Sequence, residues 1–147
     1  MAKSERPAVA DDRSGDDQRA YVIGDDGVGI GVVKNLSGAA DPTFVGPSRR
    51  TVDAAESAGI DARRADLTDP WSLRRTGVDD ADLAVVACER DDRNVLVARI
   101  LRTKLGVDDV VVRLSDPRNA DAFDAMDVDT VCVSSMLAEE IADRLTT

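Results

Sequence analysis

Residues 21–29 read Tyr-Val-Ile-Gly-Asp-Asp-Gly-Val-Gly, an apolar stretch that runs into a glycine-rich turn. A helical pattern follows over Val28–Leu36. A short strand, a glycine-rich turn and a helix in this order are typical of the first βα turn of a dinucleotide-binding unit. In such a unit the helix N-terminus offers free N–H groups to a phosphate. This stretch therefore predicts a nucleotide-binding type of fold.

One position departs from the G-x-G-x-x-G pattern of that turn. Gly24 and Gly29 match the first and third glycines, but Asp26 replaces the second, which lets the backbone approach the pyrophosphate. A carboxylate there takes up space and repels phosphate, so we expect weak or absent NAD(H) binding. Gly24, Val28 and Gly29 either form a phosphate turn, with Gly27 in a shifted loop, or the glycines only permit the tight turn.

Outward from this turn, apolar strands alternate with helical patterns, which predicts a parallel sheet with helices on both faces. The polar stretch Met1–Arg19 is predicted to be a disordered tail, and residues 20–147 a single nucleotide-binding domain. Six strands and five crossovers predict a Rossmann-like, doubly wound α/β sheet of order 3-2-1-4-5-6. The expected strands are Ala20–Ile23, Thr43–Gly46, Asp61–Ala65, Leu83–Ala87, Val110–Leu114 and Thr130–Val133, and the expected helices are Val28–Leu36, Arg50–Ala58, Pro70–Arg75, Arg90–Leu105, Arg118–Met126 and Ser134–Leu145.

The negative charge of the chain argues against nucleic acid as a partner. It carries 29 Asp and Glu against 19 Lys and Arg, a net charge of −10, so nucleic-acid binding is not expected. Asp outnumbers Glu and Arg outnumbers Lys, which favours an acidic surface adapted to high salt over an ordinary acidic one. Apolar runs are too short to span a membrane, and no secretory signal is evident.

The chain has few residues of the types that usually catalyse reactions or bind metals. The chain has no histidine, which removes the commonest general base and nearly excludes a zinc site. Cys88 and Cys132 are isolated, and we interpret them as small core residues at strand ends. We therefore expect no catalytic residue, no bound metal and no enzyme activity.

Five segments, in the right order and spacing, resemble the TrkA-N or RCK family, the N-terminal nucleotide-binding domain of potassium-transport regulators. The resemblance covers about residues 20–145. The segments are Gly24–Gly29, Ala65–Pro70 followed by Leu73, Gly77–Asp82, Asp91–Asn94 and Val112–Pro117.

This resemblance implies a cytoplasmic, non-catalytic sensor that binds NAD(H), NADP(H) or an adenine nucleotide, forms a homodimer and acts on a potassium transporter or channel in the membrane. A smaller ligand-binding domain usually follows in the family; these 147 residues are not expected to include it, which leaves a separate polypeptide or a truncation as its explanation. Two alternatives remain open. One is a domain that keeps the fold but has lost the ligand and serves as a dimerisation module. The other is an NAD(P)-dependent oxidoreductase.

The end of the second strand lacks the acid that usually grips the ribose hydroxyls, because Gly46 stands in its place. Ser48 and Arg49 follow and are candidates to bind a ribose phosphate or another anion. The alternative is a solvated basic start to the second helix.

Other candidate site residues end the later strands. The resemblance places Asp66 and Leu67 beside an adenine, although Asp66 also has Arg63, Arg64 and Arg74 as candidate partners. Small residues at the end of the fourth strand leave room for a ligand, whereas Arg113 of the fifth favours a structural ion pair. The fourth-strand residues are Ala87, Cys88 and Glu89.

The last helix carries Leu137, Ile141 and Leu145 on one face. In the resembled family this region leads to a helix that crosses between subunits. The stripe therefore either supports a homodimer or covers the edge of the sheet.

Overall fold

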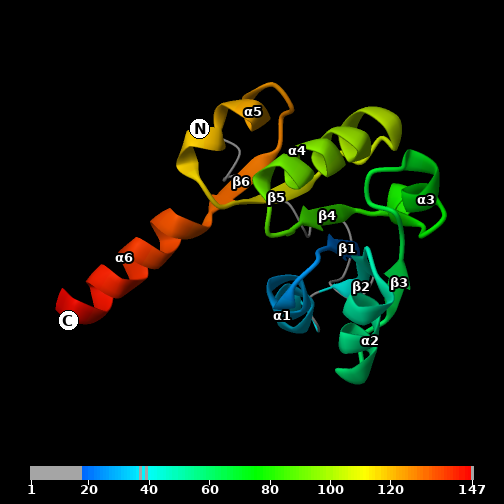
Figure 1. The fold of residues 1–147 in the computed structure, drawn as a ribbon, viewed down its shortest axis with the longest axis horizontal. Coiled ribbons are helices and arrows are strands. Elements are labelled where there is room, and N and C mark those ends of the chain that lie inside the picture. The colour runs from blue at the N-terminus through cyan, green and yellow to red at the C-terminus, as the bar shows by residue number, and fades with distance from the viewer. Residues whose placement is uncertain (1–17, 37, 39, 147) are drawn as a thin grey trace.

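The computed structural model describes residues 18–36, 38 and 40–146 and contains one six-stranded sheet (Figure 1). Its order is β3-β2-β1-β4-β5-β6, and all five strand pairs are parallel. The predicted Rossmann-like topology is thus confirmed. The carboxyl ends of β1 and β4 meet where the strand order reverses, which is where such sheets bind ligands.

One strand, Val110–Leu114, has the expected bounds, and the other five differ from theirs by one or two residues at their ends. Gln18 is buried and Arg19 opens β1, so the predicted tail extends two residues too far, and its residues 1–17 lie outside the described residues. The strands are β1 Arg19–Ile23, β2 Asp41–Gly46, β3 Ala62–Arg64, β4 Leu83–Val86, β5 Val110–Leu114 and β6 Asp129–Cys132.

The helices follow their capping residues. Ser48, Asp69 and Asp116 each accept a hydrogen bond from a backbone N–H of the next turn, as expected for caps. The helices are α1 Gly27–Leu36, α2 Arg49–Ser57, α3 Pro70–Arg74, α4 Asp91–Arg99, α5 Asp121–Asp124 and α6 Val133–Thr146.

Two expected helices are shorter in the structure. The α-helical part of the predicted Arg90–Leu105 helix ends at Arg99 and continues as a wider π-helical turn over Ile100–Lys104. The predicted Arg118–Met126 helix is a 3-10 turn over Pro117–Asn119 and then the single turn of α5. Pro117 stands at the start of the 3-10 turn, where no helical backbone donor is needed, and Asp116 caps this turn.

Alternate residues of each strand pack on opposite faces of the sheet. Val22 of β1 and Phe44 of β2 pack against Val33 of α1 and Ala55 of α2. On the other face, Ile23 and Val45 join a larger cluster that includes residues of α3, α4 and α5. Figure 1 shows α1 and α2 on one side of the sheet and α4 on the other.

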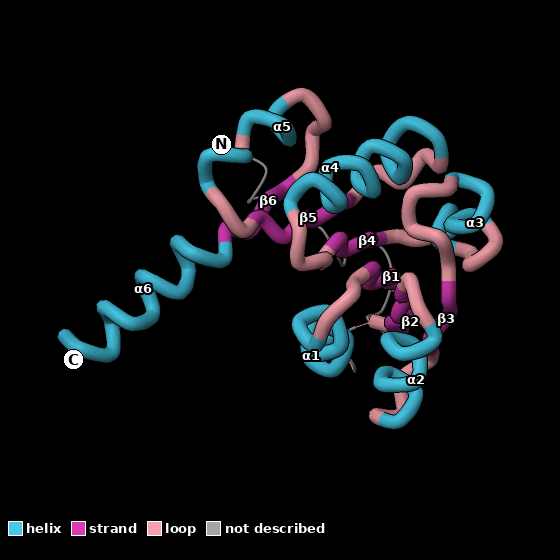
Figure 2. Tube along the Cα trace, in the orientation of Figure 1, coloured by secondary structure: helices cyan, strands magenta, loops and turns pink. Residues whose placement is uncertain are grey.

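The last helix does not cover the sheet edge. No residue of α6 is buried, and Figure 2 shows this helix running away from the sheet. The interpretation in which its apolar stripe covers the edge is therefore wrong for the isolated chain. In the described part of the chain no helix is long and apolar enough to cross a membrane.

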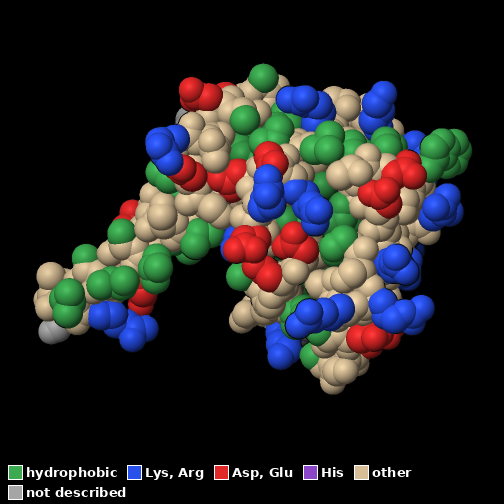
Figure 3. Space-filling model, viewed as in Figure 1, with side chains coloured by type: hydrophobic (Ala, Val, Ile, Leu, Met, Phe, Trp, Pro, Cys, Tyr) green, Lys and Arg blue, Asp and Glu red, His purple; other side chains and the backbone are tan. Residues whose placement is uncertain are grey.

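Charged side chains of both signs are interspersed over the body in Figure 3, while apolar side chains gather along α6. Most ion pairs on this surface are exposed, including Arg90–Asp92 and Arg144–Glu140. Such pairs contribute little, so repulsion within the net charge of −10 is only weakly offset by them.

We therefore expect the melting temperature of the chain to rise between low and molar salt, because a Debye length of about 3 Å at 1 M screens this repulsion. Thermal unfolding followed by circular dichroism across that range measures the effect. A matched variant with Asp53, Glu56, Asp121 and Asp124 replaced by their amides keeps the fold and should show a shallower rise. A flat or falling melting temperature in the native chain contradicts the salt-adapted surface.

Candidate functional site

The glycines of the first turn pack closely against their surroundings. A Cβ at Gly29 would lie 3.0 Å from the ring of Phe44, and one at Gly24 would lie 3.4 Å from the Cα of Gly29. Gly46 is confined in the same way, since a Cβ there would lie 3.0 Å from both Phe44 and Thr51. These contacts account for the glycines by packing, and they leave the phosphate interpretation of the turn untested.

Asp26 is engaged within the chain. Its Oδ1 accepts a hydrogen bond from the backbone N–H of Val28 in the first turn of α1, at 3.1 Å. Arg113 of β5 donates from Nη1 to both oxygens of the same carboxylate, at 3.0 and 3.2 Å. The side chains of Arg113 and Asp26 are 15% and 32% exposed. Arg113 thus forms the structural ion pair that the sequence favoured.

Asp25 also accepts from one backbone N–H and one arginine, the first in the connection from β4 to α4 and the second in the first turn of α4. Its Oδ1 accepts from the backbone N–H of Glu89 at 2.9 Å, and its Oδ2 accepts from Nη1 of Arg93 at 3.2 Å. Arg113 also donates to the carbonyl of Ala87, at 3.2 Å. We call Asp25, Asp26, Arg93 and Arg113 the Asp–Arg cluster. It joins the ends of β1, β4 and β5 and the start of α4 at the place where the strand order reverses.

The candidates after β2 have separate roles. The Ser48 hydroxyl caps α2 by accepting from Thr51 N–H at 3.2 Å, and it lies 2.6 Å from the Thr51 hydroxyl. A cavity of about 400 Å³ lies beside it, between the starts of α1 and α2. Arg50 rather than Arg49 lines this cavity, together with Asp25, Asp26 and Gly27. Arg50 is therefore better placed than Arg49 for the anion contact expected from the sequence.

Asp66 and Leu67 line a second cavity, of about 330 Å³, together with Pro47, Arg64, Thr68 and Arg93. In the described part of the chain Asp66 forms no hydrogen bond with Arg63, Arg64 or Arg74, which was one of its two interpretations. Instead its Oδ1 accepts from the N–H and the hydroxyl of Thr68, at 3.1 and 2.9 Å. These bonds, with a smaller contribution from the charge of Arg93, lower the pKa of Asp66. Leu67 is buried in the core.

The three residues after β4 mostly serve the fold. Cys88 is fully buried, and its burial together with the nearby Asp25 carboxylate raises the pKa of its thiol to about 12. A thiol of that pKa stays protonated at neutral pH and is a poor nucleophile. Ala87 and Glu89 take part through their backbone, as the carbonyl and N–H partners of the Asp–Arg cluster.

Three residues of α4 that support the site were not singled out from the sequence. Arg93 belongs to the Asp–Arg cluster, and Asn94 is fully buried beneath it. Asp91 accepts from the N–H groups of Ser115 and Asp116 and from the Asn119 side chain. Burial alone would raise the pKa of Asp91, but these bonds bring it below the ordinary value. All three lie in Asp91–Asn94, which carried the family resemblance without an assigned role.

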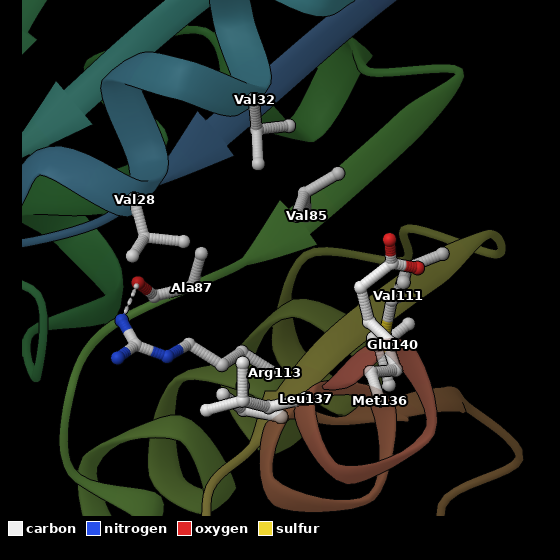
Figure 4. Close-up of a pocket in the computed structure, with 11 residues that line it drawn as sticks. Val28, Val32, Val85, Ala87, Val111, Arg113, Met136, Leu137 and Glu140 are labelled. Carbon is white, nitrogen blue, oxygen red and sulfur yellow. Dashed lines mark hydrogen bonds between the residues drawn. The ribbon is translucent and has the colours of Figure 1, made fainter. Parts of the chain in front are cut away.

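A third cavity, of about 600 Å³, lies between α1, the face of β4–β6 and α6 (Figure 4). Val85, Val111 and Val131, one from each of three neighbouring strands, line it opposite Val28 and Val32 of α1. Arg113 borders it, and its Nε has no hydrogen-bond partner among the described residues. We call this space the apolar groove.

The fold and this site together define a Rossmann-type domain in which two carboxylates of the first βα turn are engaged within the chain. The sequence profile of the TrkA-N domain matches residues 20–134, and the chain belongs to the TrkA-N domain family. The family inferred from the sequence is thereby confirmed.

Two relatives agree with this assignment. The Trk system potassium uptake protein TrkA of Mycobacterium tuberculosis is 31% identical over 131 residues, 87% of this chain and 60% of that protein. The protein of the same name from Streptomyces coelicolor is 30% identical over 77 residues, 52% of this chain and 34% of that protein. The chain thus spans no more than about 60% of the length of these relatives.

The NAD(P)-binding domain of an exopolyphosphatase-related protein from Archaeoglobus fulgidus superposes with a TM-score of 0.76 at 24% identity. The match covers 90% of this chain and 98% of that one. At this identity the likeness shows the fold.

Proposed function

We propose that this chain is a non-catalytic regulatory domain of a potassium uptake system, acting from the cytoplasmic side on a membrane subunit. The observation that carries the proposal is the family match over residues 20–134, which takes in every element around the site except most of α6. The names of both relatives support it.

The site supports a role without catalysis. An NAD(P)-dependent oxidoreductase needs a proton donor beside its cofactor. The one tyrosine, Tyr21, is buried in β1 and donates its hydroxyl to the carbonyl of Thr76 at 3.3 Å. The Cys88 thiol is buried and protonated, and the chain contains no histidine. These features favour regulation over hydride transfer.

A nucleotide remains the proposed ligand class, with NAD(H), NADP(H) and adenine nucleotides as the candidates. The residues fit only part of such a ligand. The cavities beside Arg50 and beside Asp66 suit the polar groups of a nucleotide. The Asp26 carboxylate, however, already occupies the donors that the phosphates of a nucleotide need. The same observation favours a second candidate function, in which the domain has lost the ligand and serves as an interaction module.

The regulatory proposal is tested by potassium uptake in the source cells. Deleting the gene for this chain should lower the rate of uptake from medium poor in potassium, and supplying the chain again should restore it. Uptake of a solute through an unrelated transporter serves as the control. Unchanged potassium uptake after deletion overturns the proposal.

If a nucleotide binds, we expect NADPH or a multiply phosphorylated nucleotide to bind more tightly than NADH, because Gly46 cannot hold a ribose diol while an arginine can hold a phosphate. The structure makes Arg50 the arginine at the cavity. A bond to a charged group contributes about 1.5–3 kcal/mol, so Arg50→Ala should weaken NADPH binding roughly tenfold or more. Arg49→Ala is the matched control in calorimetric titrations. Equal effects of the two variants, or a preference for NADH, would rule out this assignment.

A further inference from the structure

The Asp–Arg cluster pairs each carboxylate with the kinds of donor that phosphate-binding turns use. Asp26 accepts from an N–H at the start of α1 and from Arg113, and Asp25 accepts from the Glu89 N–H and from Arg93. Backbone N–H groups at a helix start and arginine side chains are also the usual partners of a nucleotide phosphate. The carboxylates therefore hold contacts that a ligand phosphate would need.

We propose that Asp25 and Asp26 act as built-in anions that take the place of ligand phosphates and hold the ends of β1, β4 and β5 together without a nucleotide. The inference takes its regulatory meaning from the proposed function. The structural claim itself concerns only the purified chain. It says that the charges of the domain hold it in the arrangement that a phosphate would otherwise stabilise.

The Asp–Arg cluster lies where it can tie together segments that are distant in sequence. Asp26 lies on the loop that leads from β1 to α1, and its arginine lies on β5, so this pair spans the intervening strand β4. Asp25 ties the same loop to the β4–α4 connection through the Glu89 N–H and Arg93. Two negative and two positive side chains thus join three segments that are distant in sequence.

The balance of charge also opposes a phosphate ligand. A pyrophosphate would bring further negative charge beside two carboxylates that already neutralise both arginines. It could bind at these donors only by displacing Asp26 or Asp25. Because the side chain of Arg113 is 15% exposed, salt screens its pair with Asp26 less than it screens the surface pairs. Native binding of pyrophosphate at this turn is therefore disfavoured even at high salt.

Removing one carboxylate should convert the cluster into an anion site. In Asp26→Asn the side chain keeps its size and its oxygen for the Val28 N–H but loses the charge that faces Arg113. In Asp26→Gly the side chain is gone and the turn regains the glycine that lets a pyrophosphate approach. Both variants free Arg113 for an external anion, and Asp26→Gly also frees the Val28 N–H at the start of α1.

The test is thermal unfolding of the full chain in sodium chloride and in sodium pyrophosphate at equal ionic strength. The native chain should gain in pyrophosphate only the general stabilisation that an excluded anion gives a folded protein. Asp26→Asn and Asp26→Gly should melt lower in chloride, by about 5 °C, and should recover several degrees in pyrophosphate. Calorimetric titration should show pyrophosphate, and with Asp26→Gly also NADH, binding at least tenfold more tightly than to the native chain.

Two further variants separate a specific exchange of anions from a general loss of stability. Asp116→Asn removes a carboxylate that also accepts from a backbone N–H and pairs with an arginine, Arg118, but on an exposed turn. It should gain no response to pyrophosphate beyond that of the native chain. Adding Arg113→Gln to Asp26→Asn should abolish the recovery in pyrophosphate.

The inference is overturned if the native chain is stabilised by pyrophosphate as much as the variants are, or if the variants neither lose stability nor gain affinity. It is also overturned if the double variant still responds more than the native chain does. None of these outcomes bears on the proposed regulatory function, because that function is tested separately by measuring potassium uptake in cells. Should Asp26→Gly fail to fold, Asp26→Asn alone carries the comparison.

Discussion

Ile141→Asp is expected to convert a dimer of this chain into a monomer while the far-ultraviolet circular dichroism stays that of a folded protein. The reason lies in α6, whose apolar side chains are exposed in the single chain. Leu137 is 58% exposed, Ile141 52% and Leu145 81%. Positions 137, 141 and 145 succeed one another at four-residue steps and so share one face of the helix.

The body of the domain offers a matching surface. The apolar groove is lined by valines of β4, β5 and β6 and, on its other side, by Met136 and Leu137 at the start of α6. Figure 4 shows Val85, Val111 and Leu137 around it. An exposed helix stripe and an uncovered sheet face in one chain are the two halves of a self-complementary interface. A second copy of the chain would remove both from water, and a charge at position 141 would have to be buried with them.

Light scattering on the native chain at tens of micromolar, at high salt, measures the expected dimer. Ala142→Asp is the matched control. It introduces the same charge on α6, roughly 100° around the helix from Ile141, and should leave the dimer intact. A monomeric native chain, or equal dissociation by both variants, refutes the assignment of the dimer to this stripe.

The sheet was predictable because its local signals agree with its packing. The apolar runs of β4 and β5 predict strands buried on both faces, and one face is indeed buried, since Ala84, Val86, Val110 and Val112 are 0% exposed. On the other face Val85 and Val111 are only partly buried and line the apolar groove, so the prediction is wrong for that face of the single chain. The capping pairs Asp69–Pro70 and Asp116–Pro117 begin helical turns where expected. Gly59 and Gly106, which follow α2 and the π-helical turn, adopt φ values of 80° and 72°, the left-handed conformation in which glycine often ends a helix.

The site was less predictable because its contacts join residues far apart in the chain. Asp26 reads from the sequence as an obstacle to phosphate, and nothing local indicates that it meets Arg113, 87 residues later. The register of β4 and β5 brings them together. The choice between Arg49 and Arg50 depends likewise on how α2 is rotated about its axis against the rest of the domain, which places Arg50 at the cavity.

Asn94→Ala is expected to destabilise the domain by about 3 kcal/mol or more, because it removes the buried side chain that joins β4 to β5 beneath the Asp–Arg cluster. Asn94 is fully buried. Its Oδ1 accepts from the Cys88 N–H at 3.0 Å, and its Nδ2 donates to the carbonyls of Cys88 and Arg113 at 2.9 and 3.0 Å. Each buried backbone group that loses its partner costs about 1–3 kcal/mol.

Denaturant unfolding of the full chain measures the loss, which corresponds to a fall of roughly 10 °C in melting temperature. Asn35→Ala is the matched control, because Asn35 is an exposed helical asparagine with one bond, to the carbonyl of Gly31. It should change stability by less than about 0.5 kcal/mol.

Asn94→Asp tests the direction in which stability changes with pH. The new carboxylate faces two carbonyls, which together with burial raise its pKa, so its deficit relative to the native chain should shrink as the pH falls and the acid becomes a donor. A deficit that grows on acidification, or an Asn94→Ala variant as stable as the control, would show that this side chain does not hold the two strands together.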